Sequence, residues 1–273
     1  QPLTTGMQDD VLHRRLGSDR DVTDFKQQRG GSASLVEMGA NPLLLALQIG
    51  VFLKDDRQLP ERRTELYEKG VRLLLRRVEI GDTGQRDAQV IAKAMKPVPE
   101  RPRPLDQRVE KLMAVLCHAG HVLHVQKHKR IFEAAEVHEI LEDPGSDLGM
   151  DRGVAVAAWE DLLQDGRGIL MCVEQDADGE GDLRYNSYQS THLTLQEYFA
   201  AKQCVKDARA SGDLLQSFEA VFGPNPSPWL REVHLMVAEM LTGDEFKLLA
   251  DYYLDHDDGS GAASVRVTTM LKC

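Results

Sequence analysis

The chain has 273 residues, 42% of them hydrophobic, which is enough to bury one large core or a few small ones. Lys and Arg number 33 against 44 Asp and Glu, for a formal net charge of −11. A surface this acidic repels polyphosphate, so the chain as a whole is a poor candidate for binding nucleic acid or an anionic membrane. A basic patch at residues 126–130 ("QKHKR") is a local exception.

The four cysteines are scattered and form no C-x-x-C pair: Cys117, Cys172, Cys204 and Cys273. This distribution is typical of reduced thiols in an intracellular protein. No signal peptide opens the chain, and the longest apolar run, residues 42–53, is too short to span a bilayer. Because the chain starts at Gln1 without a methionine and stops within an apparent new helix, we expect a piece of a longer cytoplasmic protein.

Helical periodicity dominates the first 80 residues. Residues 7–17 predict a helix that ends at Gly17, with the apolar Met7, Val11 and Leu12 on one face. A further helix is predicted to begin with Asn41 as N-cap and Pro42 at the first helical position. Proline fits there because its missing N–H would have had no partner.

Residues 59–79 repeat this pattern, with Pro60 opening a helix. Its expected buried stripe is Leu66, Val71, Leu74 and Val78. The pattern then breaks, because four prolines fall within residues 97–104. We therefore predict a helical domain over residues 1–80 and a connector over 81–104.

Residues 105–210 predict three helices, a hairpin and a longer helix. The helices cover 105–125, 130–143 and 154–166, and the two β-like runs cover 168–175 and 183–190. This is the element order of a winged-helix domain with an added C-terminal helix. Residues 211–273 again predict helices, as the start of a second helical domain. The expected fold class is therefore mainly α: a helical domain, a winged-helix domain with a small β-hairpin, and a further helical segment.

The last helix of that domain begins at a candidate site. Thr194 and Glu197 have capping-box spacing, which predicts a helix start near Leu195. His192 would lie two residues before the cap, where an anion would meet an imidazole donor and the positive end of the helix dipole. The alternative is a half-buried histidine that bridges the hairpin to a neighbouring helix. The expected buried face of the helix is Leu195, Tyr198, Phe199 and Val205.

Two groups of residues suggest metal sites. Cys117, His121, His124 and His128 would line one face of a helix, but four ligands on one straight helix cannot converge tetrahedrally on zinc. A partly exposed polar stripe is the alternative, and both interpretations stay open.

Residues 176–187 place acidic residues at EF-hand offsets, yet Ser187 stands where calcium needs a bidentate glutamate. An acidic, solvated wing explains this loop better. We assign no metal site and no catalytic residue, because no nucleophile elbow or paired carboxylates stand out.

Several segments, in order, resemble NACHT-type signal-transduction ATPases of the STAND class, to which NLR proteins of innate immunity belong. Residues 1–4 ("QPLT") look like the exit from the family's nucleotide-binding core. Residues 39–77, from "GANPLLL" to "LLLRR", are similar to its first helical domain. Residues 166–203, ending in "STHLTLQEYFAAKQ", are similar to the end of its winged helix. Residues 227–241 resemble the Trp-containing helix that opens its second helical domain.

The resemblance implies two nucleotide contacts. Pro42 matches the proline that packs on the adenine, and His192 matches the histidine that contacts the β-phosphate of ADP in the resting state. Ser190 departs from the pattern, because the family usually has an aromatic residue there. The chain contains no G-x-x-x-x-G-K-[ST], so the core that binds ADP or ATP with Mg is expected before Gln1. Residues 51–56 ("VFLKDD") look like a Walker B strand only by coincidence.

By this resemblance the chain is the regulatory, or lever, part of a nucleotide-gated ATPase and is not itself catalytic. It would help to hold ADP in the autoinhibited state and would rearrange on ATP exchange to allow oligomerisation. The expected partners are the upstream nucleotide-binding domain, further copies of the protein, and sensor and effector domains. One alternative is a helical interaction scaffold without nucleotide control. Another is a DNA-binding regulator, which the acidic third helix (Glu160, Asp161, Asp165) disfavours.

Overall fold

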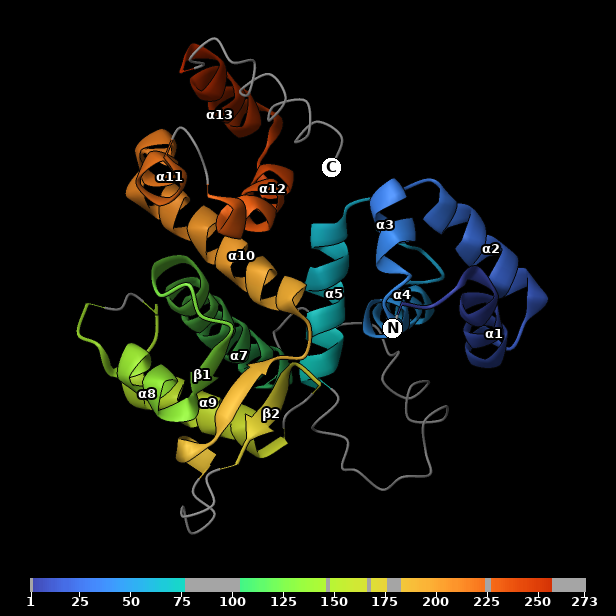
Figure 1. Ribbon diagram of the computed structural model, residues 1–273, viewed down its shortest axis with the longest axis horizontal. Coiled ribbons are helices and arrows are strands. Elements are labelled where there is room, and N and C mark those ends of the chain that lie inside the picture. Colours follow the sequence, from blue (N-terminus) through green and yellow to red (C-terminus); the bar gives the residue numbers. More distant parts are fainter. Residues whose placement is uncertain are drawn as a thin grey trace. The chain divides into compact units, whose positions relative to one another are not determined.

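The computed structural model describes residues 2–76, 104–145, 148–165, 168–175, 183–223 and 227–256. In these residues the chain is mainly α-helical with one three-stranded antiparallel sheet (Figure 1), which confirms the predicted class at that level. No helix in them is long and apolar enough to cross a membrane. The chain divides into two compact units, Gln1–Val109 and Glu110–Cys273. Most of the predicted connector lies outside the described residues, so the predicted domain boundaries stay predictions.

The first unit is built from short helices. They are α1 (Thr5–Leu16), α2 (Asp19–Gly30), α3 (Ala33–Met38), α4 (Pro42–Lys54) and α5 (Arg63–Arg76). Each of the first four helices starts at a side chain that accepts a backbone N–H, as N-cap residues do: Thr4, Ser18, Ser32 and Asn41. Its core contains Leu12, Leu16, Val22, Phe25, Leu45, Ile49 and Phe52. The rings of Phe25 and Phe52 meet edge to face at 5.3 Å, so α2 and α4 share this core.

Two expectations for this unit need correction. Met7 is 51% exposed, and Gln8 turns inward in its place, because α1 buries the i, i+4, i+8 row that also contains Leu12 and Leu16. The helix predicted from Pro60 begins at Arg63 instead. The start of α4 at Asn41 and Pro42 is confirmed. Leu66 and Val71 are buried as expected, Leu74 is half-buried, and Val78 lies outside the described residues.

The second unit contains the sheet and the longest helix that the structure describes. Its elements, starting within α7, are α7 (Pro104–His121), the π-helical turn η2 (Val122–Gln126), β1 (Ile131–Glu133), α8 (Ala134–Glu142), α9 (Arg152–Asp165), β2 (Leu170–Glu174), the 3-10 turn η3 (Leu183–Tyr185), β3 (Ser187–Ser190), α10 (Leu193–Ser211), α11 (Leu214–Phe222), the 3-10 turn η4 (Pro228–Leu230), α12 (Arg231–Met240) and α13 (Gly243–Asp255).

The sheet has the strand order β1-β3-β2, and both pairs are antiparallel. Tyr188 on β3 lies opposite Phe132 on β1 and Cys172 on β2. Phe132 and Tyr188 are buried, and the ring of Trp159 from α9 lies 6.1 Å from that of Phe132. The predicted hairpin strands are therefore present in shortened form. The prediction of helix from residue 130 was wrong, because Ile131–Glu133 forms β1 first.

α10 is the central helix of this unit and packs against α11 and α12 (Figure 1). α7 approaches it closely at Gly120, where an added Cβ would lie 2.8 Å from the Cβ of Phe199. A glycine is needed there because any side chain would push the two helices apart. The buried face predicted for α10 is confirmed: Leu195, Tyr198, Phe199 and Val205.

Candidate functional site

Pro42 lies exposed in the first turn of α4. Behind it, the Asn41 Oδ1 accepts the backbone N–H groups of Leu43 and Leu44, at 2.9 and 3.2 Å. These two bonds satisfy amides that have no partner within the helix. The helix start is therefore fixed by Asn41, while the ring of Pro42 is free to meet a ligand or a partner.

His192 caps α10, and this corrects the expected capping box. The helix begins at Leu193, and the His192 Nδ1 accepts the backbone N–H of Thr194 at 3.2 Å. Thr194 is therefore inside the first turn, with its Oγ1 2.6 Å from the same Nδ1. His192 is the N-cap residue because its backbone is extended (φ −141°, ψ 136°) and its ring nitrogen accepts the Thr194 N–H, which has no partner within the helix.

This bond fixes the tautomer of His192. A backbone N–H can only donate, so Nδ1 must carry the lone pair and the ring proton must sit on Nε2. Protonation of Nδ1 would break the cap and put a cation at the positive end of the helix dipole. Burial also lowers the pKa of His192. At neutral pH the residue is therefore a neutral imidazole that offers its Nε2–H as a hydrogen-bond donor.

The turn that presents His192 is anchored on both sides. The hydroxyl of Thr191 donates to the Gly168 carbonyl at 2.8 Å, and the Thr191 N–H donates to the Ile169 carbonyl at 2.8 Å. In the first turn of α10, the Gln196 side chain donates to the Lys129 carbonyl at 2.7 Å. The turn is thus bonded to the segment before β2, and the first turn of α10 is bonded to the segment before β1.

The histidine and cysteine row on α7 and η2 does not converge on one point. His121 lies beside the buried Cys204, with Nδ1 and Sγ 3.4 Å apart. His124 is fully buried and stacks on Trp229 at 4.7 Å, while His128 meets the edge of the same indole at 6.1 Å. Within the described part of the chain, no three candidate ligands form a cluster that could hold a metal ion. The calcium-like loop lies mostly outside the described residues.

The basic patch at residues 126–130 is largely neutralised. Lys127 and Lys129 both bind the Glu136 carboxylate, at 2.7 and 2.9 Å. Burial raises the pKa of this carboxyl, but the two lysines outweigh burial and hold the pKa below its usual value. The guanidinium of Arg130 lies over the Trp229 ring at 5.0 Å. The cavity of about 400 Å³ beside β1 is lined by both lysines and several glutamates, so it is not an anion site.

Pro42 is exposed and lies in the first compact unit, whereas His192 is half-buried and lies in the second. A sequence comparison with known protein families and with curated proteins found no match.

Proposed function

We propose that this chain is the regulatory part of a nucleotide-gated signal-transduction ATPase of the NACHT type. In this proposal the second unit contains a winged helix. The element order α7, β1, α8, α9, β2, β3 and the strand order β1-β3-β2 support that assignment. α9 would be the recognition helix of a DNA-binding relative, and its exposed Glu160 and nearby Asp161 favour a role other than DNA binding.

The observation that carries the proposal is the state of His192. Its Nδ1 is committed to the Thr194 amide, so a neutral Nε2–H is offered beside the N-terminus of α10. A phosphate oxygen is the kind of acceptor that this donor and the helix dipole both favour. The exposed Pro42, at a helix start held by Asn41, supplies a flat apolar surface suited to an adenine ring.

In this proposal the bound nucleotide shifts the balance between a resting and an active arrangement of the protein. ADP bound by an upstream domain would contact His192 and stabilise the resting arrangement. Exchange for ATP would remove that contact, free the winged-helix unit and expose surfaces for oligomerisation. Such a switch works only if the nucleotide interacts more favourably with one arrangement than with the other.

Two substitutions separate capping from nucleotide contact. His192→Asn keeps an excellent N-cap but is too short to place a donor where Nε2 lies, whereas His192→Ala removes both. In the full-length protein we expect both variants to release a fluorescent ADP analogue about 10–100-fold faster than the wild type, the range for one hydrogen bond to a charged group. Only His192→Ala should also lower the melting temperature.

Unchanged ADP release in both variants, with an unchanged monomer fraction, would contradict the proposal and favour a scaffold without nucleotide control. Tight, salt-sensitive binding of the chain to duplex DNA in a gel shift would instead favour a DNA-binding regulator.

A further inference from the structure

The first unit contains a buried cation whose position calls for an explanation. Arg29, in the last turn of α2, is only 9% exposed, and its Nη1 donates to the Oε1 of Gln8 at 3.0 Å. Burial lowers the pKa of Arg29 and the charge of Asp9 opposes this, but an arginine stays charged at neutral pH. Removing a guanidinium from water is costly, so the contacts it makes must define its position closely.

These contacts form a relay to the segment that enters the unit. The Gln8 side chain accepts from Arg29 and donates its Nε2–H to the Leu3 carbonyl at 3.2 Å. The Leu3 N–H in turn donates to the Ala40 carbonyl at 2.7 Å. The entering chain is therefore bonded to the turn that immediately precedes Asn41 and Pro42.

The guanidinium also supports that turn directly. A Cβ added to Gly39 would lie 2.6 Å from the Nη1 of Arg29 and 3.4 Å from the Oε1 of Gln8. The backbone of Gly39 thus rests on the Arg29–Gln8 pair with no room for a side chain. The turn at Gly39 and Ala40 is therefore hydrogen-bonded to Leu3 through Ala40 and packs against Arg29 at Gly39.

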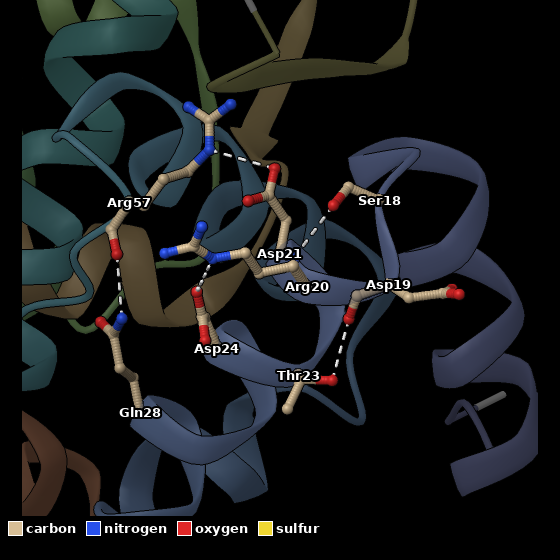
Figure 2. A network of polar contacts seen from close by, with 8 residues as sticks. All are labelled: Ser18, Asp19, Arg20, Asp21, Thr23, Asp24, Gln28 and Arg57. Atoms are coloured by element: carbon tan, nitrogen blue, oxygen red, sulfur yellow. Dashed lines mark hydrogen bonds and ion pairs between the residues drawn. The ribbon is translucent and has the colours of Figure 1, made fainter.

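The neighbouring residue of α2 holds the opposite end of α4. The Gln28 side chain donates to the Arg57 carbonyl at 2.9 Å and accepts the Leu59 N–H at 2.8 Å. Figure 2 shows Gln28 and Asp21 reaching Arg57 from the same helix, with Asp21 and Arg57 3.2 Å apart. The contacts of Arg29 therefore lie just before α4, near Pro42, whereas the comparable contacts of Gln28 lie just after the end of α4.

We infer that Arg29 is a positioning residue that couples the entering chain to the Pro42 turn. Through Gln8 and Leu3, a displacement of the entering segment moves the turn, and with it the ring of Pro42. The consequence for nucleotide binding rests on the function proposed above. The mechanical coupling stands on the contacts of this chain alone.

The coupling is tested by NMR-detected hydrogen exchange on this chain. Arg29→Met keeps the apolar stem and removes the guanidinium, and we expect about tenfold faster exchange of the Leu3, Leu43 and Leu44 amides, as for the loss of one hydrogen bond. Gln28→Leu is the matched control and should accelerate Leu59 instead. Equal effects of the two variants on Leu3, or no effect of Arg29→Met there, would overturn the inference.

A second variant guards against unfolding of Arg29→Met. Gln8→Glu keeps an acceptor for Arg29 but cannot donate to the Leu3 carbonyl, so it cuts the relay while the guanidinium stays paired. We expect faster exchange at Leu3 in a fully folded protein. Exchange at Leu3 that matches the wild type would show that the relay carries no coupling.

Nucleotide release separates the two proposals. In the full-length protein, Arg29→Met should release ADP about tenfold faster than Gln28→Leu when both are compared at the same margin below their melting temperatures. A wild-type protein that holds no ADP would overturn the proposed function, while the exchange experiment still decides the coupling. ADP held and released equally by both variants would overturn the positioning role of Arg29.

Discussion

The two nitrogens of His192 have different tasks. Nδ1 closes the first turn of α10, which fixes the ring in place, and the ring proton stays on Nε2. Asparagine or serine would cap the helix as well, but neither would extend a donor beyond the cap. The choice of histidine at this position is therefore explained by a contact outside the helix more readily than by capping alone.

At the residue scale, sequence reasoning identified Asn41 and Pro42 correctly because their local chemistry determines a helix start. It misplaced the start of α10 by preferring Thr194, since the choice between two capping side chains depends on the backbone angles of His192. It missed Arg29 altogether. The sequence around Arg29, at the end of α2, does not predict that its side chain is buried, because the burial results from the approach of Gly39 and Gln8.

Gly120 is the residue that lets α7 and α10 touch. We expect Gly120→Ala to lower the free energy of unfolding by about 1–3 kcal/mol, because the new Cβ would meet the Phe199 Cβ at 2.8 Å. Gly6→Ala in α1 is the control, since nothing lies within 4 Å of its added Cβ and alanine favours a helix. Urea denaturation of both variants measures the difference, and equal stability would contradict close packing at Gly120.

At the element scale, the π-helical turn η2 frees the carbonyl of His124 for another partner. Trp229 on η4 donates its indole N–H to that carbonyl at 2.7 Å and stacks on the imidazole. Two segments more than 100 residues apart are thereby joined. No sequence pattern predicts this contact, because a π-helical turn and a stacked partner both depend on tertiary packing.

Acid should weaken this joint. Burial lowers the pKa of His124 to about 4, the backbone of Trp229 beside the imidazole opposes this, and the charges of Arg130 and His128 lower the pKa further. The unfolded chain binds a proton near pH 6.5, so stability is full above that pH and falls as the pH drops towards 4. We expect His124→Phe, which can still stack on Trp229, to lose less stability over this range.

The measurement is the urea unfolding free energy of both proteins at pH 7, 5.5 and 4. A smaller dependence should remain in the variant, because burial also lowers the pKa values of His121 and His192. Parallel pH profiles for the two proteins would contradict a neutral, buried His124.

The start of α13 responds at lower pH. Glu245 forms a bidentate ion pair with Arg209, at 2.9 and 2.8 Å, and a capping box with Thr242. The Arg209 hydrogen bond is the main reason that the pKa of Glu245 is lowered to about 2. The stability that the ion pair contributes is fully present above pH 4.5, the pKa of Glu245 in the unfolded chain, and is lost as the pH falls towards 2.

Glu245→Gln should therefore destabilise the protein by about 1 kcal/mol at pH 7 and by much less at pH 2.5, because the exposed ion pair is screened by solvent. Thermal unfolding at the two pH values measures the difference. A gap that stays constant with pH would show that the ion pair contributes nothing.

Elements of the second unit were predictable in proportion to their length. The long periodic run of α10 and the two β-like runs were found, whereas β1 has three residues that continue directly into α8. A strand this short has no period to detect, and it exists because Phe132 pairs with Tyr188 and packs on Trp159. The formation of β1 therefore depends on tertiary pairing, which no local sequence pattern predicts.

At the scale of the whole molecule, the proposed function requires a phosphate-binding loop to hold the nucleotide. No segment of the 273 residues has the glycine-rich pattern that wraps a triphosphate and places a lysine on it. Residues 51–54 end α4, and Asp55 caps it, so the Walker B likeness does not lie on a strand. We expect the isolated chain to show no ATP turnover in a phosphate-release assay. Measurable turnover that remains after contaminating ATPases have been excluded would contradict this.

In the proposed function, ADP stabilises the resting arrangement of the protein through its contact with this chain. The most direct measurement is the nucleotide content of the purified full-length protein, determined by chromatography after denaturation. We expect close to one ADP per wild-type chain and a marked loss of ADP from His192→Asn, at an unchanged melting temperature of the isolated chain. A wild-type protein free of nucleotide, or a His192→Asn protein that retains ADP fully, would contradict it.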